Sequence, residues 1–211
     1  MLNPLEGVNR LNQPEMTLPK WLERSRIPSI RIAIENDYYV RAWRPIVNHF
    51  KNRDSLLTWD DFLIGLHLAY SWMPTIPKLE RTFSVSAVQQ SQAIEVINRL
   101  RELGKIPNVE ELETLKSICN NSIIGVSKLL HFISPDSCPI YDRRVARRFF
   151  RPNIYNVNRV DLYVSYRDTL KSWLQNTEIR ERIEEMRASI KLIEDAPPIR
   201  VLELVLFEDE R

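Results

Sequence analysis

Glycine, cysteine and histidine are all scarce in this chain, and each shortage excludes a class of chemistry. Four Gly among 211 residues form neither a glycine-rich phosphate-binding loop nor a dinucleotide-binding fingerprint, so nucleotide-dependent chemistry is not expected. Two cysteines, Cys119 and Cys138, are too few for a four-cysteine iron–sulfur cluster or zinc site, and only three His remain. We therefore expect neither a metal nor another cofactor.

Long apolar runs are also missing. No stretch reaches the ~18 apolar residues that a membrane-spanning helix needs, and the first ten residues lack the apolar core of a signal peptide. We therefore expect a cytoplasmic protein that does not bind membranes. The 30 Lys and Arg nearly balance the 28 Asp and Glu, so total charge does not indicate a nucleic-acid partner and the clustering of charges must be considered instead.

Signals for β-strands are nearly absent, which predicts an all-α fold. The chain contains no Asn-Gly or Asp-Gly turn, and its most β-like stretch, Val201 to Phe207, also fits a helix. Elsewhere, apolar residues recur at intervals of three and four, and Thr58, Ser86 and Gly104 supply start and stop signals. The predicted helices cover residues 36–53, 62–72, 86–104, 109–120, 128–133, 142–151, 159–175, 178–195 and 198–207.

The domain organisation predicted from these patterns is simple. Residues 1–35 contain four Pro and no sustained period, so we expect an irregular N-terminal lead-in. Residues 36–211 are expected to form a single all-α domain. Two lobes are suggested within it, one from 36–105 with the C-terminal helices and one from 106–160.

Arginines gather on one side of the predicted helix 142–151. At 100° per residue, Val145 and Ala146 fall on the opposite, apolar side, and no acidic residue follows Asp142 until Asp161. Such a cluster is typical of phosphate binding, with a solvated or salt-bridged surface as the alternative. The five arginines are Arg143, Arg144, Arg147, Arg148 and Arg151.

Asp142 falls on the apolar side of the first turn of that helix. The positive end of the helix dipole favours a carboxylate there, whereas partial burial removes water from it. Asp is also one of the commonest N-cap residues. The sequence therefore leaves two interpretations of Asp142, a structural cap and a functional carboxylate.

Residues 120–151 resemble the catalytic core of the helix-hairpin-helix DNA glycosylases, the superfamily of endonuclease III and 8-oxoguanine glycosylase. That core has a Gly-hydrophobic-Gly hairpin, a lysine in many members, an apolar helix, and an aspartate after a Pro-hydrophobic pair. Here Gly125-Val126-Ser127 corresponds to the hairpin and Lys128 to the lysine. Leu129 to Ile133 corresponds to the apolar helix, and Pro139-Ile140-Tyr141-Asp142 to the approach to the aspartate.

This resemblance implies two helical lobes with a cleft, and a monomer that flips a modified or damaged base out of double-stranded DNA and excises it. Asp142 would stabilise the cationic sugar or take a proton from the attacking water. A neutral Lys128 would attack the sugar and nick the strand. Either base excision repair or defence against phage DNA with modified bases would use such a reaction.

The resemblance also implies the remaining site residues. Gly125 and Ser127 would bind a DNA phosphate together with the five arginines. The candidates for a base pocket are ring side chains near helix ends, each of which is otherwise a core residue: Trp43, Trp72, His131 and Tyr141.

Three features differ from the usual pattern. Ser127 replaces the second Gly, and Lys128 follows the hairpin one position early. Lys128 and Asp142 are 14 residues apart, which is about one helical turn shorter than the usual separation. We therefore expect mainly an abasic-site product. Two other functions fit the sequence: a DNA-binding module without catalysis, and an all-α protein-interaction domain whose arginines meet an acidic partner.

Overall fold

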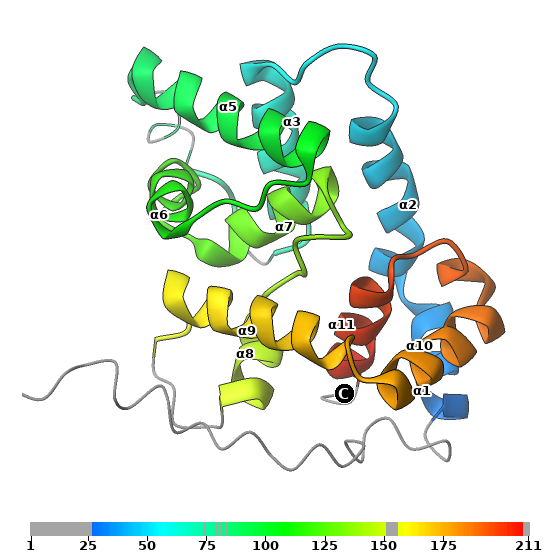
Figure 1. Ribbon diagram of the computed structural model, residues 1–211. Helices are drawn as coiled ribbons and strands as arrows, with labels where there is room; N and C mark the ends of the chain where they lie inside the picture. Colours follow the sequence, from blue (N-terminus) through cyan, green and yellow to red (C-terminus); the bar gives the residue numbers. More distant parts are fainter. Residues whose placement is uncertain are drawn as a thin grey trace, which may run out of the picture.

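The computed structural model describes residues 27–73, 75–78, 80, 82, 84–150 and 156–208, and every extended regular element in these ranges is a helix (Figure 1). The all-α prediction is thus confirmed for this part of the chain. No helix in it is long and apolar enough to cross a membrane. The helices are α1 (Ile27–Asn36), α2 (Tyr38–Lys51), α3 (Trp59–Ser71), α5 (Ala87–Leu103), α6 (Val109–Ile118), α7 (Ile123–Ile133), α8 (Arg143–Phe150), α9 (Val160–Trp173), α10 (Thr177–Ser189) and α11 (Pro198–Glu208), with the 3-10 turn η3 (Lys191–Ile193) between the last two.

Side-chain caps fix where several of these helices begin and end. Reciprocal capping boxes start α3 at Thr58, α5 at Ser86 and α6 at Asn108. Gly104 ends α5 in the left-handed conformation with φ 61°, which glycine adopts without steric cost. The predicted start of α3 and both ends of α5 are therefore confirmed.

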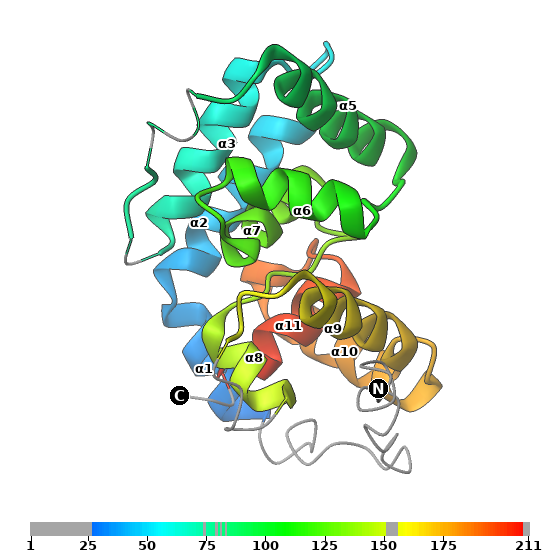
Figure 2. The ribbon, with the colours of Figure 1, turned by 90° about the vertical axis from the view of Figure 1, so that its left-hand side faces the viewer.

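The helices form two packed groups. One contains α3, α5, α6 and α7, and the other contains α1, α8, α9, α10 and α11, while α2 contacts members of both (Figures 1 and 2). Helix α7 is central to the fold, because it packs against α2, α3, α5, α6 and α9. Gly65 lets α3 and α7 approach closely, since a Cβ there would lie 2.5 Å from Leu129 Cδ1.

The hairpin expected at Gly125-Val126-Ser127 is not present, because these residues lie inside α7. The turn lies earlier, where Asn120 and Asn121 adopt left-handed φ values of 61° and 55°, a conformation that Asn tolerates better than most residues. Ser122 then caps α7 by accepting a hydrogen bond from the Gly125 amide at 3.1 Å. Gly125 serves packing instead, since a Cβ would lie 3.0 Å from Tyr70 Cε2.

Other boundaries also differ from the predictions. Residues 27–36, most of which were expected to be irregular, form α1 because Ile30 and Ile34 bury one side of it; residues 1–26 lie outside the described part. Helix α10 ends at Ser189, before the predicted 195.

Candidate active site

A small cavity of about 80 Å³ lies where the two helix groups meet. Lys128 and Asp142, the two catalytic residues implied by the resemblance, both line it. The two residues therefore reach the same cavity despite their unusually short separation along the chain. The complete lining is Asp37, Tyr39, Val40, Trp72, Lys128, Ile140, Asp142, Arg200, Glu203, Leu204 and Phe207.

Lys128 is a buried amine. Its side chain is 7% exposed, and Nζ donates a hydrogen bond to the main-chain oxygen of Trp72 at 2.7 Å. Because Trp72 is the C-cap of α3, the ammonium group lies at the negative end of that helix dipole. Burial lowers the pKa of Lys128 to about 8, although the carboxylates of Asp142 and Glu203 oppose this shift.

Asp142 is half-buried and lies directly before α8. Its Oδ1 accepts a hydrogen bond from the Val145 amide at 2.8 Å, and its main-chain oxygen accepts one from Ala146 at 2.9 Å. Asp142 is therefore the N-cap of α8. Since the same side chain also lines the cavity, the cap and the functional carboxylate are compatible interpretations.

Helix α11 adds two buried charged residues that the sequence analysis missed. Arg200 is 4% exposed and Glu203 is 2% exposed, and Arg200 Nη1 donates to Glu203 Oε1. Glu203 Oε2 also accepts a hydrogen bond from the Ile140 amide at 2.7 Å. Burial raises the pKa of Glu203 to about 7, against the opposing effects of Arg200 and of this amide. The available signal was an Arg and a Glu three apart inside an apolar helix.

An aromatic wall closes one side of the cavity. The rings of Tyr39 and Trp72 lie 5.4 Å apart, and the Trp72 ring meets Phe132 edge-on at 5.1 Å. Tyr39 is 47% exposed, so this wall reaches solvent. Of the four ring residues predicted for a base pocket, Trp72 lines this cavity.

The other three predicted pocket residues are buried in the core. Trp43 Nε1 donates to His131 Nε2 at 2.8 Å, and His131 Nδ1 lies 2.8 Å from the Cys138 carbonyl oxygen. Because a carbonyl only accepts, Nδ1 carries the proton, and burial holds the pKa of His131 well below its usual range. Tyr141 is fully buried against two other tyrosine rings. These side chains support the cavity rather than line it.

Helix α8 presents its arginines beside the cavity. Its exposed side carries Arg143, Arg144 and Arg147. Within the described part of the chain, none of these three guanidinium groups forms an ion pair. Arg144 lies over the ring of Phe207, 5.1 Å from its centroid, and Phe207 is a cavity residue. The side chain of Arg148 and all of Arg151 lie outside the described residues.

The two predicted phosphate-binding residues of α7 are buried. Gly125 faces Tyr70, and Ser127 Oγ donates to the Ile124 oxygen at 2.9 Å. Ser127 Oγ also lies 3.1 Å from both the amide nitrogen and the carbonyl oxygen of Tyr141. Ser127 therefore ties α7 to the segment that leads to Asp142.

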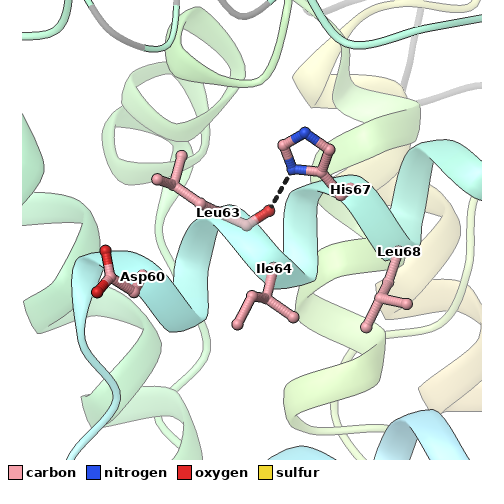
Figure 3. A pocket seen from close by; sticks show the side chains of 5 residues that line it. All are labelled: Asp60, Leu63, Ile64, His67 and Leu68. Atoms are coloured by element: carbon pink, nitrogen blue, oxygen red, sulfur yellow. Dashed lines mark hydrogen bonds between the residues drawn. The ribbon is translucent and has the colours of Figure 1, made fainter.

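Two other surface pockets are weaker candidates for a functional site. A shallow depression on α3 is lined mainly by apolar side chains, and its His67 Nδ1 donates to the Leu63 oxygen at 2.8 Å (Figure 3). A groove of about 700 Å³ beside α2 contains arginines that pair with carboxylates, such as Arg44 with Asp195 at 2.6 Å. The cavity at Lys128 is the better candidate because it combines buried charges with shifted pKa values.

Residues 87–210 match the protein family described as a family of unknown function (DUF6308), and the chain belongs to that family. The matched region extends from α5 to α11 and so includes Lys128, Asp142, Arg200 and Glu203, whereas Tyr39 and Trp72 precede it. No curated protein and no solved structure matches the chain.

Proposed function

We propose that this member of the DUF6308 family is a DNA glycosylase, which takes a modified or damaged base out of duplex DNA and excises it to leave an abasic site. The observation that supports this most is that Lys128 and Asp142 line one cavity. The resemblance implies catalytic roles for these two residues. The buried amine and the nearby carboxylate are the kinds of groups that acid/base chemistry needs.

The proposed fold is of the helix-hairpin-helix glycosylase type, with its cleft at the boundary of the two helix groups. The turn at Asn120 and Asn121 between α6 and α7 takes the place of the hairpin. Elements of both groups line the cavity, because Trp72 and Lys128 come from one group and Glu203 from the other.

In the proposed reaction, Asp142 stabilises the positive charge that develops on the sugar as the glycosidic bond breaks, and it accepts a proton from the attacking water. Lys128 is mostly protonated at neutral pH, because its pKa is about 8. Its Nζ is also held by the Trp72 oxygen at 2.7 Å. We therefore assign hydrolysis, rather than attack by the lysine, as the main route.

The proposed partner is duplex DNA, which the exposed arginines of α8 contact through its phosphates. The flipped base stacks on the aromatic wall formed by Tyr39 and Trp72, whose rings lie 5.4 Å apart. The same reaction serves either base excision repair or defence against phage DNA that carries modified bases.

The central test is excision by the Asp142→Asn variant. Asparagine is as good an N-cap as aspartate, so this change removes the negative charge while an oxygen can still accept the Val145 amide. We expect the fold and DNA binding to persist while excision falls by about 10²–10⁴-fold. Asp136→Asn is the control, because Asp136 is exposed and lies outside the cavity. Near-normal excision by Asp142→Asn would contradict the proposal.

The substrate panel consists of duplexes carrying damaged bases and phage DNAs carrying modified bases. Released base and alkali-labile strands are measured, and borohydride is added to trap any lysine adduct. We expect base release with little trapping. Strong trapping that is lost in Lys128→Ala would instead show that the lysine attacks the sugar.

A DNA-binding module without catalysis is a second candidate, favoured by the hydrogen bond that makes Asp142 a cap. In that case DNA binding occurs and no base is released from any substrate. Phosphate contact itself is tested with Arg143→Ala/Arg147→Ala, which should make the salt dependence of binding shallower by up to ~2 in log–log slope. An unchanged slope would favour a protein-interaction domain.

A further inference from the structure

The buried pair of Arg200 and Glu203 lines the same cavity as both proposed catalytic residues. All four side chains line it, and they come from three different segments of the chain. Glu203 is attached to one of these segments directly, because its Oε2 accepts the Ile140 amide at 2.7 Å. Neither the resemblance nor the family match assigns a role to either residue.

We propose that Glu203 is a positioning residue of this site: it fixes the segment from Ile140 to Asp142 against α11, and its negative charge stabilises the protonated form of Lys128. The inference rests on the proposed function for the catalytic roles of Lys128 and Asp142. The positioning itself is a property of the protein alone.

The positional role follows from how residues 140–142 are held. Glu203 binds the Ile140 amide from α11, and Ser127 bonds to the main chain of Tyr141 from α7 at 3.1 Å. Asp142 follows directly and begins α8. Because each helix anchors one peptide unit, the carboxylate of Asp142 is placed by two buried side chains rather than by a free loop.

The electrostatic role follows from the groups around Lys128. The ionisable residues that line the cavity with it are Asp37, Tyr39, Asp142, Arg200 and Glu203. Burial lowers the pKa of Lys128, and the charge of Arg200 lowers it further. The charges of Asp142 and Glu203 raise it. The one imidazole nearby on α7, His131, is buried and neutral. Glu203 is therefore one of two carboxylates that oppose loss of the lysine proton.

The charge is tested with Glu203→Gln, which keeps an oxygen able to accept the Ile140 amide. The pKa of Lys128 is measured from its ¹⁵Nζ chemical shift in labelled protein, with Lys128→Arg used for assignment. We expect a downward shift from about 8. Lys171 on α9 serves as an internal reference that does not move, and Glu194→Gln is the matched exposed control. An unchanged or raised pKa of Lys128 would overturn the electrostatic role.

The wild-type protein supplies a second measurement that needs no variant to fold. The chemical shifts of Glu203 Cδ and Lys128 Nζ are followed in the same pH titration. When two ionisable groups interact, the titration curve of each contains a step at the pKa of the other. We expect the Lys128 resonance to respond at the Glu203 midpoint, near pH 7. A Lys128 curve without that step would overturn the electrostatic role.

The position is tested with Glu203→Asp, which keeps the charge but shortens the side chain by one methylene. We expect faster hydrogen exchange at the Ile140 amide and a smaller change in the Lys128 pKa than in Glu203→Gln. Unchanged exchange at Ile140 would overturn the positional role. None of these measurements uses DNA, so failure to detect base excision would refute the proposed function without affecting their outcome.

Discussion

Asp61 at the start of α3 and Glu203 in α11 both expose very little surface, yet the pKa values of their carboxyl groups are shifted in opposite directions. Their residues are 3% and 2% exposed. Burial acts to raise the pKa of Asp61, but hydrogen bonds from Thr58 and the charge of Arg53 outweigh it and leave that pKa below 3.8. Burial instead dominates at Glu203 and raises its pKa to about 7.

The difference comes from what covers each carboxylate. Asp61 Oδ2 accepts hydrogen bonds from Thr58 N, Thr58 Oγ1 and Arg53 at 2.9, 2.8 and 3.0 Å, and the Arg53 side chain is 39% exposed. Glu203 lies deep in the protein, at the wall of the cavity, and binds one amide and one buried arginine. A carboxylate with little exposed surface can therefore still be well stabilised in its charged form, if hydrogen-bond donors and a nearby cation surround it.

The largest effect is expected when the buried pair loses its cation. Arg200→Met leaves the buried carboxyl group of Glu203 without its cationic partner, although the Ile140 amide still bonds to it. Breaking a buried ion pair in this way costs about 3–5 kcal/mol. Urea unfolding measures it, with the unfolding slope as a check on two-state behaviour. Replacing both residues with apolar ones should restore much of the loss, because neither member of the pair then remains as an unpaired buried charge. A loss below about 1 kcal/mol for the single variant would mean that Glu203 is better solvated than its burial indicates.

The contributions of Glu203 and Asp61 to folding stability should also change with pH in opposite directions. The raised pKa of Glu203 gives a contribution to stability that is complete below 4.5 and is lost as pH rises through about 7. The lowered pKa of Asp61 gives one that is present above 3.8 and is lost as pH falls through its folded value. Between pH 5 and 7.5, wild type should therefore lose on the order of 2 kcal/mol relative to Glu203→Gln. Parallel pH profiles for the two proteins would contradict the raised pKa.

Local signals explain why the Asp61 region was predictable. Thr58 and Asp61 form a capping box that needs only four consecutive residues, and Gly104 ends α5 by its own backbone preference. The start of α7 was missed because Gly125 was interpreted as part of a hairpin. Its real signal was the pair Asn120 and Asn121, whose left-handed backbone makes the turn before the cap at Ser122.

The cavity could be predicted only in part. A helical wheel places Asp142 at the start of an amphipathic helix, and the resemblance adds Lys128, but neither shows that the two share a cavity. The roles of Arg200 and Glu203 depend on which helices pack around α11. The same holds for Trp43 and His131, which differ from Trp72 by burial rather than by any local pattern.

A smaller effect is expected at the cap of α3. Thr58→Ala removes the hydroxyl that accepts the Asp61 amide at 3.3 Å and donates to its carboxylate at 2.8 Å. Loss of such a cap costs about 1 kcal/mol. The pKa of Asp61 should also rise toward its ordinary value, so the variant should lose less stability than wild type between pH 5 and pH 3. Carboxyl NMR titration checks the pKa, and an unchanged value would assign the shift to Arg53 and the main-chain amide of residue 58 rather than to the Thr58 hydroxyl.

The smallest effect is expected from Arg53→Met, the counterpart of Arg200→Met. Both changes remove the guanidinium next to a hidden carboxylate, but Arg53 is 39% exposed and its charge is screened by water. Exposed ion pairs contribute about 0–1 kcal/mol and weaken with salt, and Thr58 still bonds to Asp61 in the variant. The loss measured by urea unfolding should therefore stay below about 1 kcal/mol and shrink at high salt, unlike that of Arg200→Met. Equal losses from the two variants would show that solvent-inaccessible area alone, rather than the groups that cover a carboxylate, governs the cost of an unpaired charge in this fold.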